Sequence, residues 1–155
     1  MDSLADRDPI TELICHFREA LKGGDYTSLS TVGFRVDETS MLAPDGWIWE
    51  RAKAREANRH DYLVGVPDIA ILLYSAPARL EDNRCKISMY LKYGIRNLWL
   101  VHSANESVYL FTDEVADPVV LTGSHTLYLP KPMPSAGIPI SEIFRDCNDL
   151  DGCPT

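Results

Sequence analysis

The sequence has no run of about 18 apolar residues, so no transmembrane helix and no membrane association are expected. Its first residues, MDSLAD, lack the basic and apolar regions of a secretory signal peptide, which predicts a cytoplasmic protein. The four cysteines form no CxxC pair, and no histidine lies at metal-ligand spacing from them, so a zinc site is not expected. In a reducing compartment these cysteines are expected to be free thiols.

Basic residues are also scarce. Fifteen lysines and arginines stand against 23 aspartates and glutamates, which gives a formal net charge of −8. Because non-specific DNA affinity comes mainly from Lys and Arg, this balance argues against a general nucleic-acid binder. It does not exclude a nuclease, since acidic residues can hold a metal ion that coordinates the phosphate. DNA therefore stays among the candidate partners, although the charge disfavours it.

The 155 residues, of which 45% are apolar, suffice for one domain with its own core. We expect this domain over residues 9–146, with an N-terminal extension over 1–8 and an acidic C-terminal tail over 147–155. The expected order of elements is helix, strand, strand, polar excursion, strand, helix, then strands. This order predicts an α/β domain with a mixed sheet and helical cover.

Two segments carry the clearest local patterns. Apolar residues recur at helical spacing from Ile10 to Leu21, after Asp8 and Pro9, and predict a helix that ends at Gly23. Residues 67–74 are almost all apolar, which is typical of a central strand buried on both faces. The other expected elements are strands over 31–36, 41–49, 98–101 and 126–129, a polar helix or loop over 51–62, a helix over 86–93, a hairpin over 107–111 and 119–121, a loop over 130–139 and a helical turn over 140–144.

The segment from Gly65 to Val101 carries a more specific pattern. Along it come Pro67-Asp68, a strand ending at Ser75, a helix with Lys86 and Tyr90, the turn Gly94-Ile95, and the strand LWLV at 98–101. Together with Pro44-Asp45 and the closing segment 140–144, this pattern resembles the putative restriction endonuclease family common in cyanobacteria, over roughly residues 10–145. The resemblance implies a restriction-endonuclease-like fold of the PD-(D/E)XK type, a mixed β-sheet flanked by helices.

The resemblance also implies a catalytic site. In this fold class two carboxylates hold Mg²⁺, which polarises the phosphate and activates a water, and a lysine stabilises the developing charge. By resemblance, Asp45 is the first carboxylate and a metal ligand, and Lys86 is the catalytic lysine. The second carboxylate belongs at position 72, where this sequence has a leucine. Leucine cannot ligate a hard cation, so position 72 predicts a degenerate site.

Three acidic residues are weaker candidates for the missing ligand. Asp68 lies on the same strand face as Leu72, but four residues along a strand span about 13 Å. Glu81 and Asp82 belong to the following loop and could swing back. A second chain could also supply the carboxylate. A structural interpretation is open for the same residues. Asp45 and Asp68 are equally compatible with residues that begin a strand, and Lys86 with a solvated lysine on a helix.

Aromatic residues accompany the first carboxylate. Trp47 and Trp49 share a strand face with Asp45, because strand faces alternate with period two. They are expected either in the core or as a binding patch in the former catalytic cleft. The four histidines have no mutual spacing for metal or nucleophilic chemistry, and are expected to be structural or exposed.

Three functions are therefore compatible with the sequence. The first is a catalytically degenerate nuclease-fold protein that acts by binding a partner, which Leu72 and the net charge of −8 support. The second is an active DNA endonuclease that uses Mg²⁺ and a relocated carboxylate. The third is an oligomeric interaction protein without a nucleic-acid role. It is suggested by the short segment before the first helix, which leaves no room for the family's first strands and predicts an uncovered sheet edge.

Overall fold

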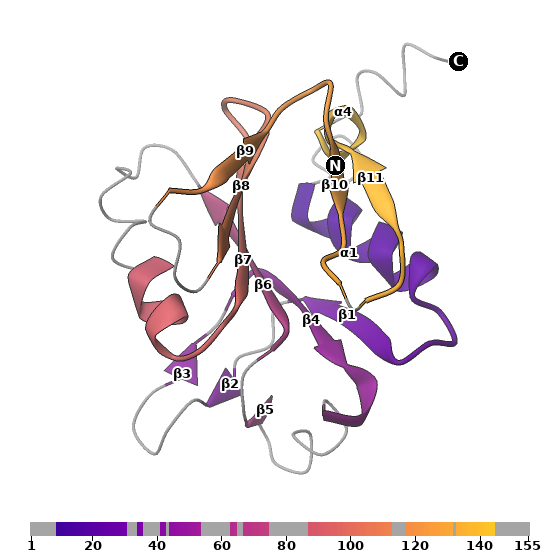
Figure 1. The fold of residues 1–155 in the computed structure, drawn as a ribbon, viewed down its shortest axis with the longest axis vertical. Helices are drawn as coiled ribbons and strands as arrows, with labels where there is room; N and C mark the ends of the chain where they lie inside the picture. The colour runs from indigo at the N-terminus through magenta and orange to yellow at the C-terminus, as the bar shows by residue number, and fades with distance from the viewer. Residues whose placement is uncertain are drawn as a thin grey trace, which may run out of the picture.

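The computed structural model describes residues 9–30, 34–35, 41–42, 44–53, 63–64, 67–74, 87–112, 117–131 and 133–144. Its main sheet has six strands in the order β1-β4-β6-β7-β8-β9 (Figure 1). The strands β6 and β7 are parallel, and all other neighbouring pairs in this sheet are antiparallel, so the sheet is mixed. The six strands are β1 (Tyr26–Ser30), β4 (Gly46–Glu50), β6 (Ile69–Tyr74), β7 (Asn97–His102), β8 (Ser107–Thr112) and β9 (Val119–Leu121).

Two apolar layers cover the two faces of this sheet. Figure 1 shows α1 (Pro9–Ala20), the pair β10 (Thr126–Tyr128) and β11 (Gly137–Pro139), and α4 (Ile140–Ile143) on one side. A short helix over residues 87–92 covers the other side. Neighbouring residues of the central strands alternate between the layers, as a pleated strand requires: Ile71 packs under α1, and Leu72 packs with the helix residues Ile87 and Tyr90.

The helix α1 is held to the sheet by close packing and by polar contacts. Its apolar face buries Leu13 and Phe17, which are 0% exposed. Gly46 lets β4 approach the helix, because a Cβ there would lie 2.8 Å from Cδ1 of Ile14. The Nε2 atom of His16 lies 2.8 Å from the carbonyl oxygen of Gly137, which ties α1 to β11.

Several predicted elements agree with the structure. The helix from residue 9, the central strand in 67–74, the helix in 86–93, the strand over 98–101, the hairpin of β8 and β9, and the last helical turn are confirmed. Among the described residues, no helix is long and apolar enough to cross a membrane. The predicted extension over 1–8 and the tail over 147–155 lie outside the described residues.

The first strand of the main sheet was missed. A five-residue strand, β1, comes before the predicted segment 31–36 and pairs with β4, while the described part of that segment forms β2 (Phe34–Arg35). The buried face of β1 carries a serine instead of an apolar residue. Ser28 is 0% exposed, and its hydroxyl donates to the carbonyl of Ile14 over 2.8 Å. A buried serine leaves no apolar alternation in the sequence, so the strand was missed.

The predicted strand over 41–49 is in fact two strands in two sheets. β3 (Met41–Leu42) joins β2 and β5 (Leu63–Val64) in a small three-stranded sheet, while β4 joins the main sheet. The break falls at Pro44-Asp45, because proline has no N–H to donate to a ladder. The predicted loop over 130–139 also needs correction, since its last residues form β11 and pair with β10 outside the main sheet.

Candidate functional site

Asp45 lies where the pairing of β4 with β6 ends. Its N–H donates to the carbonyl of Ile71 over 2.9 Å, and its Oδ2 accepts a hydrogen bond from the N–H of Leu73 over 2.7 Å. These two bonds fall on either side of Leu72. The pairing of Gly46 with Ile71, continued by one residue, also sets Asp45 opposite Leu72. The structure therefore brings the predicted first carboxylate and the degenerate position together.

Leu72 is part of the apolar layer under the helix 87–92. Its side chain is 1% exposed and belongs to the same cluster as Ala70, Leu100 and Tyr90. Mg²⁺ requires oxygen ligands in a near-octahedral arrangement, and the described residues of this apolar cluster add no second carboxylate beside Asp45. No group of three or more His, Cys, Asp or Glu side chains among the described residues could hold a metal ion. The described residues therefore do not fit the Mg²⁺ site of a two-carboxylate nuclease.

Asp68 repeats the arrangement of Asp45 at the other end of the same strand pair. Its N–H donates to the carbonyl of Ile48 over 2.9 Å, and its Oδ2 accepts from the N–H of Glu50 over 2.7 Å. Each Pro-Asp dipeptide thus precedes one strand and caps the other. Because Asp68 caps the far end of β4, its carboxylate is not placed beside Asp45.

The remaining predicted residues fall into two groups. Lys86, Glu81 and Asp82 lie outside the described residues, so their roles stay predictions. Trp47 and Trp49 are 0% and 2% exposed and pack edge to face, with ring centroids 5.5 Å apart. Of the two expectations, a core position agrees with the structure and an exposed binding patch does not, because both rings belong to the apolar cluster that contains Ile87 and Tyr90.

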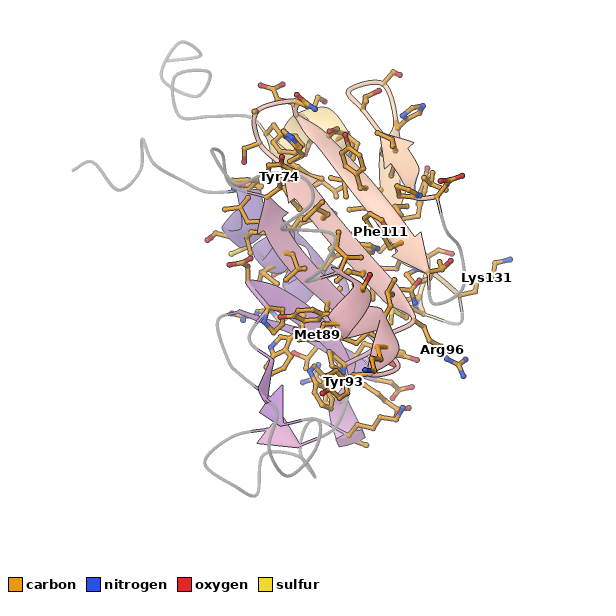
Figure 2. The ribbon with its side chains drawn as sticks, turned by 90° about the vertical axis from the view of Figure 1, so that its left-hand side faces the viewer. Tyr74, Met89, Tyr93, Arg96, Phe111 and Lys131 are labelled. Carbon is orange, nitrogen blue, oxygen red and sulfur yellow. The ribbon has the colours of Figure 1, made fainter. Side chains whose placement is uncertain are left out.

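Three half-buried rings lie further along the face that carries Leu72. We call Tyr74, His102 and Tyr109 the aromatic row. The ring centroids of Tyr74 and His102 are 4.2 Å apart, and those of His102 and Tyr109 are 6.2 Å apart. The Nδ1 atom of His102 accepts a hydrogen bond from the N–H of Asn105 over 3.2 Å, which fixes the orientation of the ring. In Figure 2 Tyr74 lies beyond the helix that carries Met89, so this end of the face is not covered by that helix.

The aromatic row was not predicted from the sequence. The signal was present in the strand parity: Tyr74 is two residues after Leu72, and His102 is two residues after Leu100. These leucines are paired in the parallel ladder, as are Tyr74 and His102. Only the register between β6 and β7 brings the two rings together.

His125 lies elsewhere in the chain. Its Nδ1 atom accepts a hydrogen bond from the N–H of Thr122 over 2.9 Å, in agreement with a structural role.

A mixed sheet with helical cover on both faces and a Pro-Asp beside a central strand is the arrangement of a nuclease-like fold. The family model described as "Uma2: Putative restriction endonuclease" matches residues 5–141, and the chain belongs to this family. A crystal structure of a putative nuclease of the DUF820 group from Anabaena variabilis is similar, with a TM-score of 0.72 and 14% sequence identity. The match covers 88% of this chain and 78% of that chain, and shows a shared fold. The comparison with curated proteins gave no match.

Proposed function

We propose that this chain is a catalytically degenerate member of the putative restriction endonuclease family, and that it acts by binding a partner. The observation that carries the proposal is the pair of hydrogen bonds from Asp45 to the backbone of Ile71 and Leu73, which place its carboxylate beside Leu72. At the position where the family pattern has a second carboxylate, this chain has a buried apolar side chain.

The bond to Leu73 also limits what the Asp45 carboxylate can do. Its Oδ2 already accepts a backbone N–H at 2.7 Å. This bond occupies one of the two carboxylate oxygens, and the other keeps its acceptor capacity. A strand-capping role of Asp45 therefore rests on a hydrogen bond of the structure, whereas a metal-binding role would need a second carboxylate beside Leu72.

The aromatic row supports a binding role for the same face. Rings that are half-buried present an apolar surface together with a polar edge, and tyrosines of this kind are enriched in protein interfaces. A net charge of −8 disfavours the phosphate backbone of DNA as the ligand. The proposed partner is therefore a protein that packs on Tyr74, His102 and Tyr109.

The loss of catalysis is tested by incubating supercoiled plasmid with the purified chain and Mg²⁺ or Mn²⁺. We expect wild type and Asp45→Ala to leave the plasmid equally intact. Nicking by wild type that Asp45→Ala abolishes would contradict the proposal and favour the active endonuclease. In that case Glu81→Gln and Asp82→Asn would show which acid had moved into the site, and loss of activity in neither variant would point to a second chain.

The binding role is tested by affinity capture with three forms of the chain. Proteins retained by wild type should also be retained by Tyr128→Ala, because Tyr128 is 66% exposed and lies on β10, away from the row. Tyr74→Ala should lose them. Equal retention by all three forms would contradict a role for the aromatic row.

Self-association through β9 is a second candidate function. This strand ends the main sheet, and Val119 and Val120 on it are 59% and 42% exposed. An exposed apolar edge strand is a template for pairing with another chain. If the edge acts in this way, the sedimentation coefficient of wild type should rise with concentration, and that of Val119→Lys should stay at the monomer value. Identical, concentration-independent sedimentation of both forms would exclude this candidate.

A further inference from the structure

A pocket of about 500 Å³ lies at the ends of the central strands of the main sheet that are opposite to Asp45. Residues at the start of β6 and of β7 line it, including Pro67, Asp68 and Asn97. Tyr26, at the start of β1, and Lys53, just after β4, line the pocket from the same end of the sheet. The pocket and the Asp45 site are therefore separated by the length of the central strands.

Three cationic side chains from three segments line this pocket. They are Lys53, Arg96 and Lys131. Figure 2 shows Arg96 and Lys131 on the same side of the molecule, one before β7 and the other after β10. Within the described ranges, no ion pair neutralises any of the three. Among the lining residues the three cations outnumber the one carboxylate, Asp68, while Glu50 and Asp25 add negative charge near Tyr26. An anionic group of a ligand therefore has three cations to pair with, although the whole chain is acidic.

The wall of the pocket around Asp68 has different chemistry. One oxygen of its carboxylate accepts the N–H of Glu50, and an ionised carboxylate has further acceptor capacity for a ligand donor. Asn97 and Tyr26, whose side chains carry an amide and a phenol, also line the pocket. Burial, followed by the negative charges of Asp68, Glu50 and Asp25, raises the pKa of Tyr26, so its phenol stays a hydrogen-bond donor at neutral pH.

Apolar surfaces lie between these polar groups. Pro67, Pro130 and Met133 line the pocket together with the ring of Tyr26. A ligand must therefore offer an anionic end, a flat apolar body and hydrogen-bond donors. A guanine nucleotide combines these features, because its flat base carries adjacent N–H groups that can donate hydrogen bonds to a carboxylate. Its phosphate suits a guanidinium and two ammonium groups.

We propose that this pocket binds a guanine mononucleotide, with the phosphate on Lys53, Arg96 and Lys131 and the base on Asp68, Asn97 and Tyr26. The volume of the pocket lies in the range of small-molecule sites, which is roughly 300–1,000 Å³. The proposal is independent of the proposed function, because none of these residues belongs to the Asp45 site or to the aromatic row.

The test is isothermal titration calorimetry of the full chain with GMP, guanosine and inorganic phosphate. We expect saturable binding of GMP that is at least about tenfold tighter than that of either fragment. Arg96→Ala and Lys131→Ala should each weaken GMP by about tenfold or more, since each removes a charge-assisted hydrogen bond to the phosphate. Lys92→Ala is the matched control, because Lys92 is an exposed lysine outside the pocket and its removal should leave the affinity unchanged.

Asp68→Asn separates the base end from the phosphate end. The asparagine keeps an oxygen acceptor for the N–H of Glu50, so the strand cap survives, but the negative charge is lost. We expect weaker binding of GMP and unchanged or tighter binding of inorganic phosphate. The proposal is overturned if GMP shows no binding at about 1 mM, if phosphate alone binds as tightly as GMP, or if Lys92→Ala weakens GMP as much as Arg96→Ala does. A DNA oligonucleotide that binds the pocket more tightly than GMP would also overturn it.

Discussion

Pro44-Asp45 and Pro67-Asp68 each precede one strand of the antiparallel pair β4 and β6. Both aspartates donate a backbone N–H at 2.9 Å and accept one at 2.7 Å through Oδ2, so they are held in the same way. Their surroundings differ, since Asp45 lies beside the apolar side chain of Leu72 and Asp68 lines a pocket with three cations. The comparison shows that the same pair of strand-capping hydrogen bonds forms beside an apolar side chain and beside a charged pocket, so the cap alone gives each aspartate a structural role.

The largest effect is expected from Leu72→Glu in the absence of metal. It places a carboxylate in an apolar layer beside the carboxylate of Asp45, which combines burial of a charge with like-charge repulsion. We expect a loss of about 3–5 kcal/mol in the free energy of unfolding, or roughly 10 °C in melting temperature. Urea denaturation with EDTA measures this.

Leu98→Glu is the matched control for that variant. Leu98 is 0% exposed and lies in the same layer, paired with Ala70 instead of standing beside Asp45. It should destabilise the chain to a similar extent, but addition of Mg²⁺ should restore stability only in Leu72→Glu, where two carboxylates can share the ion. Equal recovery, or none in either variant, would break the assignment of position 72.

The next largest effect concerns the two caps themselves. Asp45→Ala and Asp68→Ala each leave one backbone N–H without its acceptor, so each should cost about 1–3 kcal/mol in the free energy of unfolding. Asp45→Asn and Asp68→Asn keep an oxygen acceptor and should cost less. Chemical denaturation of the four variants measures this, and an Asp45→Ala protein as stable as wild type would remove the structural reason for keeping Asp45.

The residue after each aspartate sharpens the same comparison. Gly46 follows Asp45, whereas Ile69 follows Asp68, because α1 lies close to β4 at Gly46. Gly46→Ala should lower the free energy of unfolding by about 1–2 kcal/mol through overpacking against Ile14. Adding Ile14→Val should recover part of this loss. Gly123→Ala, where a Cβ would meet nothing within 4 Å, should change the stability by less than about 0.5 kcal/mol.

The smallest effect concerns Tyr26, close to Asp68. Its pKa is raised in the folded chain, so above the ordinary phenol pKa of about 10 the unfolded chain loses this proton first. The stability contributed by the neutral phenol is complete below that pH and is lost as the pH rises toward the folded pKa. Tyr26→Phe should therefore lose less stability between about pH 9 and pH 11 than wild type does, as measured by melting temperature. Parallel curves for the two proteins would refute this.

Much of the fold could be predicted because its central elements carry strong patterns. The apolar run of β6 and the helical spacing of α1 are local signals, and both were placed correctly. β1 and β11 were missed for a physical reason. A buried serine hydroxyl bonded to Ile14 replaces an apolar residue in the first, and the second contains Pro139 and follows a proline-rich segment. Tertiary contacts decided these segments, and such contacts leave no periodic signal.

The candidate site was only partly visible in the sequence. Asp45 and Leu72 could be paired by resemblance, and the ladder between β4 and β6 brings them together. The aromatic row and the charged pocket depend on register and on chain segments far apart in the sequence, such as Tyr26, Arg96 and Lys131. No local pattern links such residues, so only the fold reveals them.

The most direct test is calorimetric titration of Mn²⁺ into wild type, Asp45→Ala and Leu72→Glu. If Leu72 has removed the second metal ligand, wild type and Asp45→Ala should give the same flat titration, and Leu72→Glu should bind the ion. Saturable binding by wild type that Asp45→Ala abolishes would contradict this, because it would show that another carboxylate completes the site.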